Sequence, residues 1–147
     1  MTPYFEPRFL ACLLLRAPGS PLAWSLTQRF EPPFSLNSLH LVQIEGMIWE
    51  NINAPEATRR VAARKAQQLW QGLWAEGVFQ QIKPNWEAAF LQSLELNRKA
   101  GRQVARPTAC MHVGLAATSG ATHFLSFEPR TREAAGLLHL KVLPEQL

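Results

Sequence analysis

Proline and glycine break this sequence into short segments, and their spacing constrains the fold more than any other feature. Between the breaks, helical patterns alternate with brief apolar stretches that have the length of strands. We expect strands near residues 4–5 and at 34–36, 78–82, 121–127 and 138–142. We expect helices at 9–15, 22–29, 38–51, 55–76, 84–99 and 107–119, and a short one from 129. Strands that alternate with helices predict an α/β fold with a mostly parallel sheet covered on both faces.

The size and composition of the chain favour one compact domain. A chain of 147 residues has the length of a typical domain, so we predict a single domain over residues 1–147. Hydrophobic residues make up 47% and charged residues 18%, which argues against a disordered chain. The formal net charge of +4 favours an anionic partner.

Two cysteines and one apolar run bear on the cellular setting. Cys12 and Cys110 both have apolar neighbours, so we expect two reduced core thiols rather than a disulfide framework or a zinc site. The longest apolar run, Phe9–Leu15, is much shorter than the ~20 residues of a membrane span. We therefore expect a cytoplasmic protein that has no membrane contact.

The acidic residues are all glutamates, because the sequence contains no aspartate. Ligands of parallel sheets gather at the carboxyl ends of the strands, and Glu6 and Glu128 each follow a predicted strand. A pair of carboxylates at such an edge suits Mg²⁺ or Mn²⁺, which prefer oxygen ligands. The alternative is that Glu128 only begins a helix and that Glu6 is a solvated loop residue.

The last third of the sequence carries a family resemblance. Residues 111–128, MHVGLAATSGATHFLSFE, are similar to the closing segment of PIN-domain proteins, and above all of VapC-type toxins. That segment commonly reads Asp-Leu-Leu-His-x-Ala-x-Ala and then Gly-Ala-x-x-Phe-Leu-Thr-Phe-Asp. Leu140–Pro144 matches the family's final strand, Leu39–Glu45 resembles its second motif, and Tyr4–Leu10 stands where its first strand ends.

This resemblance implies a three-layer α/β/α fold with a short, mostly parallel central sheet of about four to five strands. It also implies a metal-dependent endoribonuclease, in which about four acids hold Mg²⁺ or Mn²⁺ and the cation activates water. Matched residue by residue, the four acidic positions fall on Glu6, Gln43, Ala109 and Glu128. We expect His112, one helical turn from Ala109, to be packed and hydrogen-bonded rather than a metal ligand.

Two of the four acidic positions therefore lack a carboxylate. Since affinity for hard cations falls with ligand charge, our hypothesis is that the chain binds Mg²⁺ or Mn²⁺ weakly or not at all and cleaves RNA poorly or not at all. The alternative is a still-active endoribonuclease in which Glu6 and Glu128 hold one cation and Gln43 adds a neutral oxygen. A further alternative is an α/β domain that is unrelated to this family. Whether the chain is an enzyme stays undecided.

A protein that has lost catalysis can still bind. Basic residues gather before the helix at 107–119, and they are candidates for contact with RNA phosphates: Arg98, Lys99, Arg102 and Arg106. They also suit an ordinary solvated basic face.

The resemblance also implies a homodimer and an antitoxin-like protein partner. That partner would lie in a groove built by the helices at 22–29 and 38–74. Trp49 and Trp74 are candidate anchors if they are exposed. The helical spacing predicts an apolar, buried face within the helix at 55–76, which consists of Ala62, Ala66, Leu69, Trp70 and Leu73.

Overall fold

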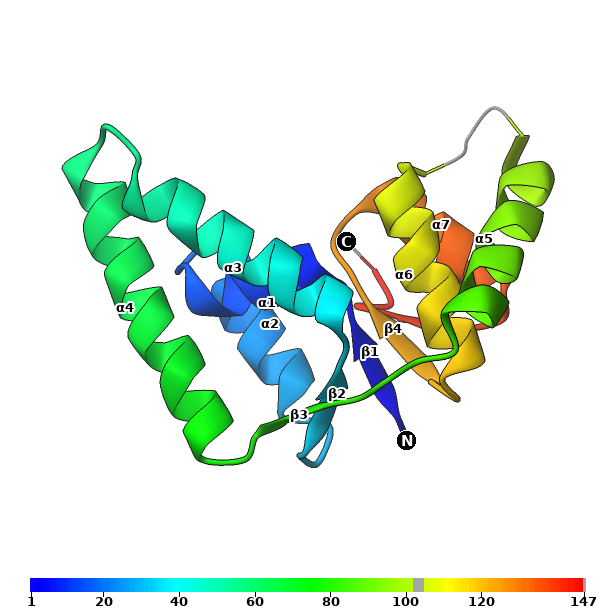
Figure 1. Cartoon of the computed structure of the whole chain (residues 1–147), viewed down its shortest axis with the longest axis horizontal. Coiled ribbons are helices and arrows are strands. Elements are labelled where there is room, and N and C mark those ends of the chain that lie inside the picture. The colour runs from blue at the N-terminus through cyan, green and yellow to red at the C-terminus, as the bar shows by residue number, and fades with distance from the viewer. Residues whose placement is uncertain (102–104, 147) are drawn as a thin grey trace. The chain divides into compact units, whose positions relative to one another are not determined.

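The computed structural model describes residues 1–101 and 105–146, and it is an α/β protein (Figure 1). The described residues form seven helices and five short strands. The strands are β1 (Pro3–Phe5), β2 (Phe34–Leu36), β3 (Phe79–Gln81), β4 (His123–Leu125) and β5 (Lys141–Leu143). The helices are α1 (Pro7–Leu14), α2 (Ser20–Thr27), α3 (Ser38–Ile52), α4 (Ala57–Ala75), α5 (Trp86–Ala100), α6 (Pro107–Thr118) and α7 (Pro129–Leu137). None of the described helices is both long and apolar enough to cross a bilayer.

The chain divides into two compact units, one of residues 1–6 with 83–147 and one of residues 7–82. All strand pairs in both units are parallel, as the sequence predicts. The five strands form two sheets, with order β1-β4-β5 in the first unit and β2-β3 in the second. The hydrogen bonds between strands therefore give two small sheets in place of the expected single central sheet of four to five strands. The single domain over residues 1–147 stays a prediction.

The first unit is built on β4, whose three residues are all buried. This strand pairs with β1 on one side, where Phe5 faces Leu125, and with β5 on the other, where Leu125 faces Leu143. The helices α5, α6 and α7 pack on one another, and α7 also packs on β5 (Figure 1). Apolar side chains thus fill the space between the sheet and the helices.

The second unit is mainly helical. Its helix α1 packs against α2, α3 and α4, and the buried side chains of Phe9, Leu10 and Ile44 form its core. The start of α3 is capped by Asn37, whose side-chain oxygen accepts hydrogen bonds from the backbone N–H groups of Leu39 and His40 at 3.0 and 3.2 Å. This cap confirms the predicted start of the helix, since Asn satisfies N–H groups that have no partner in the first turn.

The last predicted strand begins too early in the sequence. The alternation of apolar and polar residues over 138–142 indicates a strand, but α7 continues to Leu137 and β5 begins at Lys141. The helix ends in a Schellman motif, in which the N–H of His139 bonds to Gly136 and that of Leu140 to Ala135. His139 adopts a φ of 61°, so these residues close the helix before the strand can form.

Candidate functional site

Two glutamates lie at the carboxyl edge of the first unit's sheet. Glu6 directly follows β1, and its backbone N–H donates to the carbonyl of Leu125 at 3.0 Å. Glu128 comes three residues after the end of β4, and its N–H donates to the hydroxyl of Ser126 at 3.0 Å. Because β1 and β4 are parallel neighbours, both residues lie at the same end of the sheet. Glu6 is buried and Glu128 half-buried.

Ala109 belongs to the same edge. The helix α6 leads through Gly120 into β4, so it runs opposite to the strands and starts at their carboxyl end. The hydroxyl of Tyr4 in β1 lies 2.7 Å from Nδ1 of His112, which fixes where α6 meets the strand. Ala109 stands three residues earlier, about 4.5 Å nearer the start of the helix. Its methyl group supplies no ligand where the resemblance implies an acid.

His112 is packed and hydrogen-bonded, as the sequence predicts. Its side chain is 1% exposed, and Tyr4 is 3% exposed. The bond joins residues 108 positions apart in the chain. It ties α6 to β1, so His112 positions the helix on the sheet.

Gln43 is the fourth position and lies in the second unit, half-buried on α3. The structure therefore brings Glu6, Ala109 and Glu128 to one edge of one unit, while Gln43 belongs to the other. Within residues 1–101 and 105–146, no group of three or more His, Cys, Asp or Glu side chains could hold a metal ion. The donor set at the edge is two carboxylates, fewer than the four acids that the resemblance implies for Mg²⁺ or Mn²⁺.

Arg132 is a cation at this edge that sequence reasoning missed. Its guanidinium donates to the carbonyl of Ser126 at 2.8 Å and also to that of Pro144. These carbonyls follow β4 and β5, so Arg132 fastens the ends of two strands together. Burial lowers the pKa of the Arg132 guanidinium below its ordinary value, although an arginine remains charged at neutral pH. No residue pattern in the sequence marks Arg132, because its partners are backbone carbonyls.

The basic residues before α6 flank the same edge. Arg98 and Lys99 are exposed in the last turn of α5, and Arg98 lies 3.6 Å from Glu95 in an exposed ion pair. Arg106 is exposed at the start of α6. Arg102 lies outside the described residues. An exposed pair such as Arg98–Glu95 is weak, so Arg98 can exchange its carboxylate for a phosphate at little cost.

The two cysteines differ in burial. Cys110 is buried in α6, and burial raises the pKa of its thiol, while the carbonyl of Ala105 accepts a hydrogen bond from the sulfur at 3.4 Å. Cys12 is half-buried in α1. Neither is in a disulfide, so both are free thiols.

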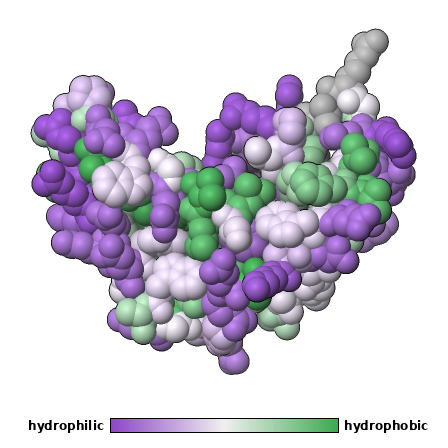
Figure 2. Space-filling model, in the orientation of Figure 1, coloured by the Kyte–Doolittle hydropathy of each residue, from purple (hydrophilic) through white to green (hydrophobic). Residues whose placement is uncertain are grey.

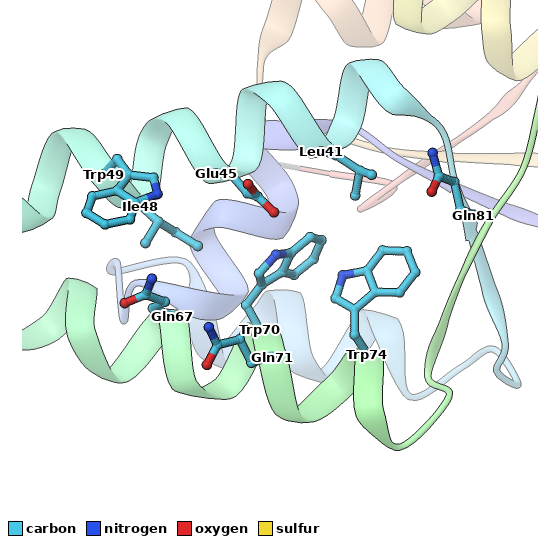
Figure 3. Close-up of a pocket in the computed structure, with 9 residues that line it drawn as sticks. All are labelled: Leu41, Glu45, Ile48, Trp49, Gln67, Trp70, Gln71, Trp74 and Gln81. Carbon is cyan, nitrogen blue, oxygen red and sulfur yellow. The ribbon is translucent and has the colours of Figure 1, made fainter.

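A groove of about 590 Å³ opens between α3 and α4 in the second unit (Figure 3). Its lining residues come from α3, α4 and β3, and they are Leu41, Glu45, Ile48, Trp49, Gln67, Trp70, Gln71, Trp74 and Gln81. The predicted anchors Trp49 and Trp74 are both among them, whereas α2 supplies none.

Aromatic rings form the floor of this groove. Trp70 and Trp74 meet edge to face, with centroids 5.6 Å apart, and both rings contact Phe79 at 5.2 and 5.8 Å. Figure 3 shows both indoles projecting from α4 toward α3. Among the described residues that line the groove, Glu45 on α3 is the one charged side chain, and it is exposed. The groove thus combines a rigid apolar floor with one negative charge, and the four-residue spacing of Trp70 and Trp74 is the signal that sequence reasoning passed over.

Comparisons with known proteins assign no family to this arrangement: no family model matches the chain, and no curated protein matches it.

Proposed function

We propose that this chain is a PIN-like protein whose acidic set is eroded and which acts by binding a segment of a partner protein in the tryptophan groove. The observation that carries the proposal is the groove itself, a cavity of about 590 Å³ lined by three tryptophans. Tryptophan is the residue most enriched at positions that dominate binding energy in protein interfaces. A three-layer PIN-like arrangement of the two units and an antitoxin-like partner belong to this proposal.

The side chains that line the groove indicate which side chains a partner segment would place in it. The edge-to-face pair of Trp70 and Trp74 accepts a large apolar side chain, because an aromatic floor offers wide contact at low entropic cost. Gln67 and Gln71 add donors and acceptors along α4. Glu45 favours a lysine or arginine on the partner, since it is the one charged side chain among the described residues that line the groove. An amphipathic segment with one basic residue fits this chemistry.

The test is selection of displayed 16-residue peptides on the full chain, followed by calorimetric titration of the enriched peptides. We expect these peptides to combine apolar side chains with a lysine or arginine. Trp49 is 52% exposed, so Trp49→Ala should leave the fold intact and weaken binding about tenfold or more. Glu45→Gln should reduce the preference for a basic residue.

Matched controls are Trp24→Ala, an exposed tryptophan on α2, and Glu50→Gln, an exposed glutamate on α3; neither residue lines the groove. Both controls should bind as the unaltered chain does. Peptides that bind Trp49→Ala with unchanged affinity, or a selection that enriches nothing, would contradict the proposal.

Metal-dependent RNA cleavage is the second candidate function. It is favoured by the two glutamates at one carboxyl edge and by Arg106, which would lie near RNA phosphates at the start of α6. Arg98 and Lys99, which are exposed in the last turn of α5, would extend this basic surface. The missing acid at Ala109 argues that the cation is held weakly, so we propose that catalysis is impaired.

This candidate is tested by calorimetric titration with Mn²⁺ and Mg²⁺. We expect no saturation up to ~10 mM, and Ala109→Asp should raise affinity about tenfold because it restores a third carboxylate. Thr108→Asp places the same charge at an exposed neighbouring position and should not raise the affinity for the cation. Saturable binding and RNA cleavage by the unaltered chain, both lost in Glu6→Gln and Glu128→Gln, would instead establish the active enzyme.

A further inference from the structure

We propose that β3 binds the partner segment as an added strand, through main-chain hydrogen bonds along its open edge. The inference rests on the proposed function, because it concerns the segment that the tryptophan groove binds, and it assigns an extended conformation to that segment. It starts from the place of β3 in the sheet of the second unit. Among the strands of residues 1–101 and 105–146, β2 is the one neighbour of β3.

The hydrogen bonds to β2 show which main-chain groups of β3 are already used. The N–H of Ile82 donates to the carbonyl of Leu36 at 2.8 Å, and the carbonyl of Val78 accepts a bond from β2 at 2.8 Å. Successive residues of a strand direct their N–H and C=O groups to opposite edges, so the even-numbered residues face β2. The N–H and C=O groups of Phe79 and Gln81 therefore point away from β2. We call these four groups the β3 edge.

The β3 edge lies beside the groove. The side chains of Phe79 and Gln81 share one face of β3, since side chains alternate along a strand. The ring of Phe79 contacts those of Trp70 and Trp74, with centroids 5.2 and 5.8 Å apart, and Gln81 lines the groove (Figure 3). A strand added at the β3 edge, about 4.8 Å from β3, would therefore direct every second side chain to the groove side of the sheet.

The exposure of β3 leaves room for such a strand. Gln80 and Gln81 are exposed, whereas Phe79 is buried. The side chain of Gln80 donates to the hydroxyl of Ser35 on β2 at 3.0 Å, on the face of the sheet opposite to Gln81. Figure 2 shows a hydrophilic surface over α4, with paler and hydrophobic residues beside it toward α3, where the groove opens. An exposed edge strand of this kind is a template for pairing with another chain.

Strand addition predicts the sequence pattern of the partner segment. Main-chain bonds to the β3 edge supply affinity, and alternate side chains supply specificity. Apolar residues at positions i and i+2 would face the ring of Trp74, while the residue between them faces away. A lysine or arginine that pairs with Glu45 would stand in the same row, because Glu45 lines the groove. A helical segment would instead show apolar residues at i, i+3 and i+4.

The first test is a methylation scan of the peptide with the highest affinity from selection on the full chain. Each backbone N–H of that peptide is methylated in turn, and binding is measured by calorimetry. We expect affinity to fall about tenfold at alternate positions, whose N–H groups donate to the β3 edge, and less than about threefold at the positions between.

The scan separates the two proposals. A helical peptide would lose affinity at every interior position, because each interior N–H bonds within the helix. A uniform loss, or no loss at any position, overturns the added strand and leaves binding in the groove standing. A selection that enriches no peptide overturns both.

The second test changes the β3 edge itself. Gln81→Pro removes the N–H that would face the added strand and keeps the bonds to β2, as proline does on edge strands. We expect peptide affinity to fall about tenfold or more. Gln81→Ala is the matched control, since it removes the same side chain but keeps the N–H, and it should lose about threefold at most. Equal losses in the two variants overturn the proposal.

Amide exchange followed by NMR tests the edge without any variant. In the free chain the N–H of Gln81 should exchange about tenfold or more faster than that of Ile82, which bonds to Leu36. Saturation with the peptide should slow exchange at Gln81 about tenfold or more and leave Ile82 unchanged. A Gln81 N–H that is as protected as Ile82 in the free chain, or that gains no protection from the peptide, overturns the proposal.

Discussion

Replacing Gly114 with alanine is expected to lower the free energy of unfolding by ~3 kcal/mol, because it forces an extra methyl group into a closed contact. Gly114 lies where α6 crosses α5. A Cβ at this position would lie 2.5 Å from the carbonyl oxygen of Ala89 and 2.6 Å from the hydroxyl oxygen of Ser93. The first of these atoms is backbone, so relief requires that the two helices separate.

A hydrogen bond of Ser93 also holds α5 and α6 together at this contact. The hydroxyl of Ser93 lies 2.8 Å from the carbonyl of Ala89 and 3.0 Å from that of Cys110, so its proton can be shared between α5 and α6. Separation of the helices would weaken this bond as well as the apolar packing. Chemical denaturation followed by tryptophan fluorescence measures the loss.

Gly136→Ala is the matched control, since nothing lies within 4 Å of a Cβ at that helical position in the same unit. It should raise stability by ~0.5–1 kcal/mol through helix propensity. A loss of less than ~1 kcal/mol for Gly114→Ala would mean that α5 and α6 are not this close.

The second large effect is expected at the hydrogen bond between Tyr4 and His112. His112→Ala should lower the free energy of unfolding by ~3 kcal/mol, because it opens a cavity and removes a partner from a buried hydroxyl. Tyr4→Phe should cost ~1 kcal/mol, since the ring keeps its stacking on Phe124. Urea denaturation of both variants and of the double variant gives the coupling energy.

We expect the double variant to cost ~1 kcal/mol less than the two single changes together. His112→Asn keeps a hydrogen-bonding atom near the place of Nδ1 and should recover part of the loss. Strictly additive effects would mean that the bond contributes nothing to stability, and that the cavity alone explains His112→Ala.

Much of the local structure was predictable from short stretches of sequence. Pro107 and Gly120 bound α6 as expected, because proline tolerates the first turn of a helix and Gly120 adopts a φ of 77° after its end. The start of the last strand was predicted too early, at 138 instead of Lys141, because the alternating apolar residues after α7 form a Schellman motif. The burial of α4 was also predicted only in part: Ala63, Ala66 and Trp70 are buried, whereas Leu69 is 37% exposed.

The candidate site was predictable to a smaller extent. The positions of Glu6 and Glu128 after strands followed from the pattern, but their shared edge requires that β1 pairs with β4 across about 120 residues of chain. Arg132 was missed because its partners are backbone carbonyls after two strands, which no residue pattern marks. The groove was anticipated through Trp49 and Trp74, but its floor needs Phe79 from β3.

The sequence by itself determined the order of the helices and short strands, that the strands pair in parallel, and that no aspartate is available for a metal site. These properties depend on backbone preferences, capping and side-chain chemistry within a few residues. Tertiary structure alone decided that Gly114 must lack a side chain, that His112 bonds to Tyr4, and that the β3 edge lies beside the groove. Each of these depends on how closely remote segments approach, and that distance is set by the packing of the whole unit.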